Sequence, residues 1–149
     1  MLKQGDKAPD FILQDEAGKD VSLDSLLSKG PVILYFYPAD FTLMCTAEAC
    51  SIRDMHDEIL AADMQVVGVS PQSSESHARF KDSHKLPFPL LFDDSRKVIR
   101  AYGVEGPFGI GVRRATYLIG QDKVILDRVV SDLFVGSHVK FIQQIIDAA

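Results

Sequence analysis

The feature that most constrains the fold is an unbroken apolar and aromatic run, PVILYFY, at residues 31–37. Such a run indicates a strand buried on both faces, because a strand with one wet face alternates apolar and polar residues. A helical pattern follows at residues 45–61, and a second buried strand, QVVGVS, at residues 65–70. Strand, helix and strand form one βαβ unit, which predicts parallel strands joined by a right-handed crossover.

The rest of the chain continues to alternate between helical and extended patterns, without an internal repeat or a linker rich in Pro, Gly and Ser. Residues 113–119 and 124–130 predict two strands of a β-hairpin. The other expected elements are a short strand at residues 89–92 and helices at residues 73–84, 95–102 and 136–148. This order predicts an α/β fold, a three-layer sandwich whose central mixed sheet is flanked by helices. The length is that of one domain, so residues 1–149 are expected to fold together.

The composition argues against several classes of function. With a formal net charge of −5 at pH 7, the chain lacks the basic surface that nucleic-acid binding requires. No stretch approaches the roughly 18 apolar residues of a membrane span, and residues 1–6 lack the apolar core of a signal peptide. We therefore expect a cytoplasmic protein without a nucleic-acid or membrane partner. Two cysteines in a reducing compartment are more often redox-active or metal-binding than a structural disulfide.

Both cysteines lie in residues 38–50, directly after the apolar strand. Ligands of open α/β sheets bind at the carboxyl ends of strands, and Cys45 falls at this place, where a helix begins. The free N–H groups and the positive dipole end of a helix start favour a thiolate over a thiol. Thr42 either caps this helix or hydrogen-bonds a substrate oxygen, while Pro38 ends the strand and forms a wall over the sulfur. The segment predicts a reactive thiol at Cys45.

A helical projection at about 100° per residue separates the two cysteines. Cys45 shares its face with the apolar Ile52 and Ile59, whereas Cys50 lies about 140° away, on the face of Asp54. In an intact helix their Cα atoms are about 8.7 Å apart, beyond the roughly 7 Å limit for a disulfide. The first turns of the helix must therefore unwind before the sulfurs join, which argues against a permanent structural bridge.

Glu48 is unusual because it is a charged residue on the buried side of this helix. A buried carboxylate needs a cation or backbone donors, so Glu48 either caps the first turn or orients an arginine near the sulfur. Arg113 and Arg114 are the candidates, and their spacing alone does not choose between them, since adjacent strand residues point to opposite faces. A zinc site is disfavoured because His56 lies about 16 Å along the helix from Cys45. No bound cofactor is expected.

The segment YFYPADFTLMCTAEACSIRD resembles the active-site segment of the peroxiredoxins. More narrowly, it resembles the branch of the bacterioferritin comigratory protein, also called PrxQ. The family pattern of Pro, three residues, Thr, two residues and Cys is met by Pro38, Thr42 and Cys45. The Thr-x-Glu that follows is met by Thr46 and Glu48.

The resemblance extends over nearly the whole chain. Cys50 matches the resolving cysteine of the branch, and residues 114–119 resemble the family's arginine-bearing strand, which selects Arg114. One departure is Leu43-Met44, where many members carry Pro-Gly. This larger apolar pair at the entrance bears on the range of substrates rather than on the type of reaction.

The resemblance implies a thioredoxin-like fold and a thiol peroxidase that reduces hydrogen peroxide and organic hydroperoxides. Cys45 is then the peroxidatic cysteine, and Cys50 resolves its sulfenic acid as an intramolecular disulfide that thioredoxin or a similar dithiol reduces. Thr42 holds the peroxide, Arg114 steadies the thiolate, and Glu48 holds Arg114. Because both sulfurs lie in one chain, a monomer is expected.

Two other classes of function remain open at this point. A thiol–disulfide oxidoreductase shares the fold class but normally carries Cys-x-x-Cys, whereas four residues separate the cysteines here. A redox sensor or chaperone without enzymatic activity would use oxidation to unwind the helix and expose apolar surface. Sustained peroxide turnover with a dithiol reductant separates the peroxidase from both.

Overall fold

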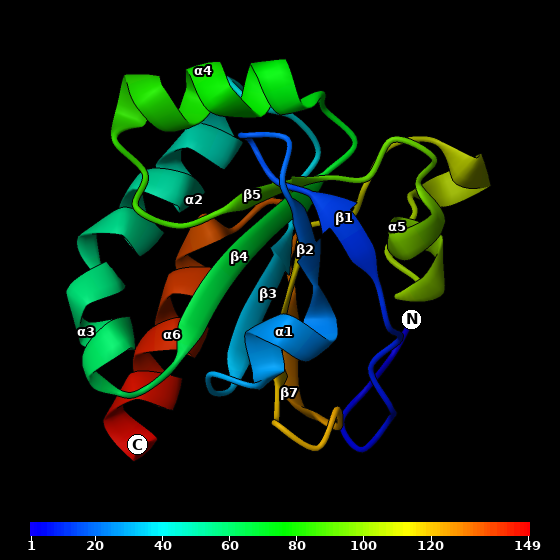
Figure 1. Ribbon diagram of the computed structural model, residues 1–149. Helices are drawn as coiled ribbons and strands as arrows, with labels where there is room; N and C mark the ends of the chain where they lie inside the picture. The colour runs from blue at the N-terminus through cyan, green and yellow to red at the C-terminus, as the bar shows by residue number, and fades with distance from the viewer.

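A seven-stranded mixed sheet forms the centre of the computed structural model, which describes residues 1–149 (Figure 1). The strand order is β2-β1-β5-β4-β3-β6-β7. The strands are β1 (Ile12–Gln14), β2 (Asp20–Ser22), β3 (Val32–Phe36), β4 (Gln65–Ser70), β5 (Leu90–Phe92), β6 (Ala115–Ile119) and β7 (Ile125–Val130). β3 pairs in parallel with β4 and antiparallel with β6, and β6 and β7 form the predicted hairpin. The predicted mixed sheet is confirmed.

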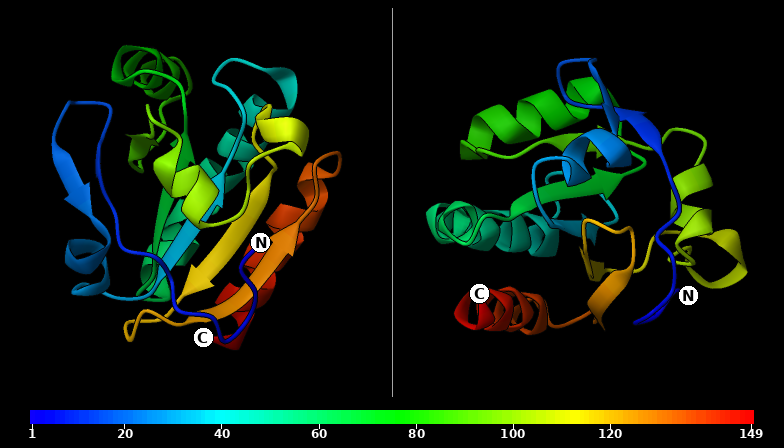
Figure 2. Two further views of the ribbon diagram at one scale, coloured as in Figure 1. Left: turned by 90° about the vertical axis from the view of Figure 1, so that its right-hand side faces the viewer. Right: turned by 60° about the horizontal axis from the view of Figure 1, so that its bottom comes forward.

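Helices cover both faces of this sheet (Figure 2). They are α1 (Leu23–Leu27), α2 (Leu43–Asp54), α3 (His56–Ala61), α4 (Ser74–His84), α5 (Lys97–Ala101) and α6 (Val135–Ala148), with a 3₁₀ turn, η1, at Pro107–Gly109. None of them combines the length and the apolar character needed to cross a membrane.

Strand β3 is buried along its whole length, as its sequence predicted. Val32, Leu34 and Phe36 enter a core shared with α1 and α5. Ile33 and Tyr35, which alternate with them, enter a second core shared with α2, α3, α4 and α6. These two cores on opposite faces of one sheet form the predicted three-layer sandwich.

Two helices replace the single helix predicted for residues 45–61. α2 begins earlier, at Leu43, and the chain bends at Met55 before α3 begins. The backbone of Met55, with φ −98° and ψ −1°, departs from regular helix geometry. α2 lies beside α6 (Figure 2), whereas α3 contacts β4, so the bend lets each helix pack against a different neighbour.

Residues 1–30 contain three elements that the sequence patterns did not predict, namely β1, β2 and α1. β1 and β2 have three residues each and lie at one edge of the sheet, where most of their side chains are at least partly exposed. A strand this short at an edge carries too few apolar residues to produce an alternating pattern.

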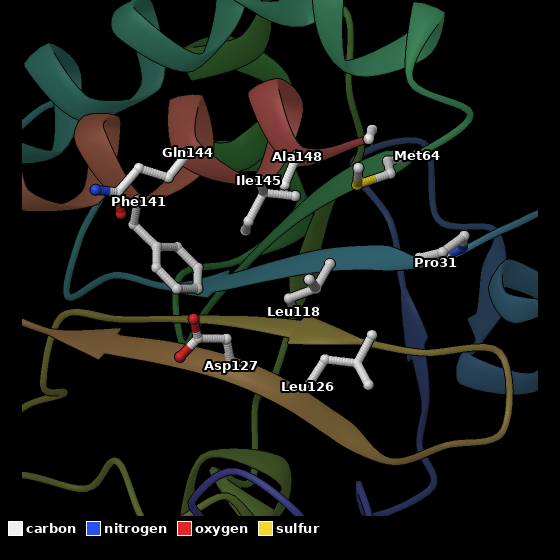
Figure 3. A pocket seen from close by; sticks show the side chains of 10 residues that line it. Pro31, Met64, Leu118, Leu126, Asp127, Phe141, Gln144, Ile145 and Ala148 are labelled. Carbon is white, nitrogen blue, oxygen red and sulfur yellow. The ribbon is translucent and has the colours of Figure 1, made fainter.

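An apolar pocket of about 400 Å³ lies where α6 crosses β6 and β7 (Figure 3). Its lining includes Leu118, Phe141 and Ile145, and Asp127 is its only charged side chain. No residue between 38 and 50 lines it, so this pocket is separate from the site of the two cysteines.

Candidate active site

Cys45 lies in the first turn of α2, after the loop that follows the central strand β3. Because α2 begins at Leu43, Cys45 is its third residue, and not its first as the sequence pattern indicated. The first N–H groups of a helix have no partner within it, and the first to bond back here is that of Thr46, which donates to the Thr42 carbonyl at 2.9 Å. Cys45 is only 2% exposed. The positive dipole end of α2 therefore lies beside this buried sulfur.

The loop between β3 and α2 carries Pro38 and Thr42. Thr42 occupies the N-cap position of α2 with extended backbone, but its side chain makes no capping hydrogen bond. Its hydroxyl instead donates to the Ala39 carbonyl at 2.9 Å, so the expected N-cap position is confirmed but the side chain makes no capping bond. Phe41, directly before it, is left-handed, with φ of 62°. The loop is thus a tight, locally bonded turn that presents the Thr42 hydroxyl oxygen at the start of the helix.

The guanidinium group of Arg114 connects Cys45 to Glu48. Its Nη2 donates to the Cys45 sulfur at 3.2 Å, and its Nη1 donates to Glu48 Oε1 at 2.6 Å. Arg114 and Glu48 are both buried. Arg113 pairs instead with the exposed Asp132, at 2.9 Å. Of the two arginines that spacing left open, the structure brings Arg114 to the sulfur, and it pairs Glu48 with this arginine rather than with the helix start.

Burial and pairing act in opposite directions on the charges of this site. Burial raises the pKa of Glu48 to about 7, although the neighbouring Arg114 acts to lower it. For Arg114, burial acts to lower the pKa, but Glu48 and Cys45 outweigh it and raise the pKa above its usual value. The guanidinium is therefore a permanent cation between a sulfur and a carboxyl group that titrates near neutrality.

Sequence reasoning missed two residues behind this group, Thr116 and His138. His138 Nδ1 lies 2.8 Å from Thr116 Oγ1 and 3.7 Å from Glu48 Oε2, an oxygen that has no hydrogen-bond partner. His138 Nε2 lies 2.8 Å from the Ser131 carbonyl, so this nitrogen carries the proton in the neutral ring. Burial lowers the pKa of His138, which favours that neutral ring. The one signal in the sequence was that Thr116 shares a strand face with Arg114.

Cys50 lies on the same helix, two residues after Glu48, and is partly exposed. Both cysteines are free thiols, and α2 is continuous between them. An intact helix holds residues five apart at about 8.7 Å between Cα atoms. The structure therefore represents the reduced arrangement, in which the two sulfurs are kept apart.

An open pocket of about 600 Å³ adjoins the arginine. It is lined by Pro38 and Arg114 on one side and by residues of the 105–113 loop on the other. The short turn η1 is part of this loop. Arg114 therefore both lines this pocket and contacts the Cys45 sulfur, whereas Cys45 itself does not line the pocket.

The family model described as the AhpC/TSA family matches residues 4–128. The chain belongs to the AhpC/TSA family. Peroxiredoxin Bcp of Bacillus subtilis (strain 168) is 43% identical over 127 residues, covering 81% of this chain and 80% of the relative. The chloroplastic peroxiredoxin Q of Sedum lineare is 43% identical over 125 residues, covering 83% of this chain and 67% of that protein.

Solved structures agree with these relatives. The crystal structure of Peroxidoxin BcpB from Mycobacterium tuberculosis matches with a TM-score of 0.93 and 35% identity, over 99% of this chain and 98% of that one. This AhpC/TSA chain is thus a peroxiredoxin of the Bcp/PrxQ branch with the thioredoxin-like fold, and both expectations from the resemblance are confirmed.

The departure of this peroxiredoxin from its branch lies at the start of α2. Leu43 is 88% exposed, and Met44 is half-buried beside Cys45. An exposed leucine at the first position of a helix adds little to stability. Leu43 and Met44 therefore form part of the surface next to Cys45.

Proposed function

We propose that this chain is a thiol-dependent peroxidase in which Cys45 is the peroxidatic residue and Cys50 the resolving residue. The observation that carries the proposal is the contact of Arg114 Nη2 with the Cys45 sulfur at 3.2 Å, with Glu48 holding the other guanidinium nitrogen. A buried thiol with a fixed cation and a helix amino terminus beside it is arranged for nucleophilic attack. The relatives named as peroxiredoxins support the same reaction.

In the first step the Cys45 thiolate attacks the terminal oxygen of a hydroperoxide. The sulfur forms a bond to that oxygen as the O–O bond breaks, giving a sulfenic acid and an alkoxide or hydroxide that takes up a proton and leaves as alcohol or water. The sulfur is oxidised by two electrons and the peroxide is reduced by two. Arg114 stabilises both the thiolate and the negative charge that develops along the breaking bond.

Thr42 supports this step as a hydrogen-bond acceptor. Its hydroxyl hydrogen is engaged by the Ala39 carbonyl, which leaves the oxygen lone pairs free. A hydroperoxide carries an O–H donor, and in this proposal the Thr42 oxygen accepts it. Pro38, which lines the adjoining pocket and has no N–H to donate, bounds the substrate on the side of the loop.

In the second step the Cys50 thiol attacks the sulfenic acid of Cys45. The S–O bond breaks, a disulfide forms, and one water is released. α2 must open between the cysteines for this to happen, because an intact helix keeps them too far apart. A dithiol such as thioredoxin then reduces the disulfide to two thiols and is itself oxidised.

Location and assembly follow from the same proposal. All the sulfur chemistry occurs within one chain, so we propose that a monomer is active. A cytoplasmic location is likewise a proposal, in line with the bacterial relative, while the plant relatives are named as chloroplastic.

Peroxide consumption coupled to thioredoxin, thioredoxin reductase and NADPH tests the function. The wild-type chain should turn over continuously, Cys45→Ser should be inactive, and Cys50→Ser should consume one equivalent without thioredoxin-supported turnover. Insulin reduction without peroxide consumption would identify a thiol–disulfide oxidoreductase instead. A single equivalent consumed by the wild-type chain, followed by no turnover, would identify a sensor.

A further inference from the structure

A second buried polar cluster lies on the other side of the active-site loop, centred on Asp40. Asp40 Oδ1 accepts a hydrogen bond from the Tyr37 hydroxyl at 2.6 Å. Asp40 Oδ2 accepts one from Ser76 Oγ at 2.7 Å and lies 2.7 Å from His77 Nδ1. Asp40 is only 6% exposed, and His77 is fully buried. One loop carboxylate is thus bound by three side chains, two of which belong to the first turns of α4.

Each ring nitrogen of His77 has a polar neighbour. Nδ1 faces the Asp40 carboxylate, and Nε2 lies 3.0 Å from the carbonyl oxygen of Leu91 on β5. His77 thus links the loop carboxylate on one side of its ring to the backbone of β5 on the other. Burial acts to raise the pKa of Asp40, but the hydrogen bond and charge of His77 and the other donors hold it below its usual value. The two residues form a buried pair, with 2.7 Å between Asp40 Oδ2 and His77 Nδ1.

The position of Asp40 gives this pair a role. Asp40 lies between Pro38 and Thr42, and directly before the left-handed Phe41. A left-handed non-glycine residue is strained and persists only when its surroundings hold it in place. The Phe41 ring also packs against Phe80 of α4, with ring centroids 5.2 Å apart. The side chains of Asp40 and Phe41 therefore attach the loop to α4, in addition to the backbone bond from Thr46 of α2 to the Thr42 carbonyl.

We propose that the Asp40–His77 pair is a positioning anchor, which holds residues 38–42 in place while the first turns of α2 unwind from Leu43 onward. The inference rests on the proposed function, because it assigns the boundary between the fixed and the moving part of that reaction cycle. Pro38 and Thr42 then keep their arrangement through oxidation, and only α2 has to refold after the disulfide is reduced.

The anchor predicts opposite requirements for the two chemical steps. Attack on peroxide needs Thr42 and the helix start in place, so a loosened loop should slow the oxidation of Cys45. Formation of the disulfide needs α2 to open, so a loosened loop should leave that step as fast as before or faster. A residue that only stabilised the fold would not separate the two rates in this way.

Rapid-quench mass spectrometry of His77→Gln measures both rates in the full chain. We expect Cys45 oxidation to slow by about 10- to 100-fold, the loss associated with a displacement near 1 Å, with no slowing of disulfide formation. The matched control is Ser73→Ala, since Ser73 caps α4 by accepting from the Ser76 N–H at 3.1 Å but does not contact Asp40. The control should weaken α4 and leave both rates within about twofold of wild type.

Equal slowing of both steps in His77→Gln, unchanged rates, or the same separation in Ser73→Ala would overturn the anchor. If His77→Gln does not fold, Ser76→Ala and Tyr37→Phe each remove one donor to Asp40 and should show the same separation to a smaller degree. Absence of sulfenic acid and disulfide in the wild-type chain would instead overturn the proposed function.

Discussion

Replacement of Arg114 by lysine tests how the active-site cation works. Arg114 contacts the Cys45 sulfur with one terminal nitrogen, at 3.2 Å, and Glu48 Oε1 with the other, at 2.6 Å. Lysine keeps the positive charge but has a single nitrogen, so it cannot make both contacts from two ends of a planar group. One hydrogen bond to a charged group contributes about 1.5–3 kcal/mol. At about 1.4 kcal/mol per tenfold change, Arg114→Lys should lower the second-order rate constant for Cys45 oxidation by about 10- to 100-fold.

Arg113→Lys is the matched control for this substitution. Arg113 is the adjacent residue, and its pair with Asp132 is substantially exposed, with side chains 41% and 46% accessible. Exposed pairs contribute about 0–1 kcal/mol, so the control should retain the wild-type oxidation rate within about twofold. Competition kinetics against a reference peroxidase measures both variants, and thermal unfolding confirms that both are folded. An Arg114→Lys rate within twofold of wild type, or equal losses in the two variants, would refute the role assigned to the two-ended contact.

Three further predictions follow from the same geometry. Because burial raises the folded-state pKa of Glu48 from its ordinary 4.5 to about 7, the folded chain retains a proton that the unfolded chain releases in this window. The contribution of Glu48 to stability is thus fullest below about pH 4.5 and falls as the pH rises to about 7, by about 3 kcal/mol. Glu48→Gln should remove this trend. Between pH 5 and 8, the free energy of unfolding measured with urea should therefore fall for the wild type relative to the variant. A difference between the two that does not depend on pH would contradict this prediction. Thr42→Val should lower the oxidation rate constant about tenfold with little change in melting temperature, since Thr42 makes no capping bond; a large loss of stability with normal oxidation would reverse that conclusion. Gly68→Ala should destabilise the fold by about 1–3 kcal/mol, because its Cβ would lie 2.8 Å from Tyr35 Cζ in the core. An unchanged denaturant midpoint would show instead that Tyr35 moves aside without cost.

The parts of the fold that the sequence predicts are those that local patterns determine. β3 and β4 are continuous apolar runs because both of their faces are covered, and a run of this kind is visible without knowledge of its neighbours. The hairpin of β6 and β7 is also predictable from sequence, because its two strands are neighbours in the chain. The edge strands β1 and β2 were not predicted because they are short and partly exposed, and the bend at Met55 reflects tertiary packing that no single segment encodes.

The candidate site likewise contains residues that are close in the sequence and residues that only the fold brings together. Cys45, Cys50 and Thr42 are linked by spacing within one segment, so sequence patterns find them together. The partner of Glu48 is 66 residues away, and spacing alone left Arg113 and Arg114 equivalent until the resemblance and then the contact separated them. His77 and Asp40 are 37 residues apart, and His138 and Thr116 are 22 apart. These histidines follow no motif, because their roles depend on which acceptors the folded chain places around each ring.

The most direct test of the central claim is the identity of the atom that first reacts with peroxide. In Cys50→Ser, treated with one equivalent of hydrogen peroxide in the presence of a sulfenic-acid trap, peptide mass spectrometry should find the adduct on Cys45. It should be absent from Cys45→Ser, and the wild-type chain should instead yield the Cys45–Cys50 disulfide. Oxidation confined to Met44, or an adduct first on Cys50 with Cys45 intact, would contradict the assignment of Cys45 as the attacking sulfur.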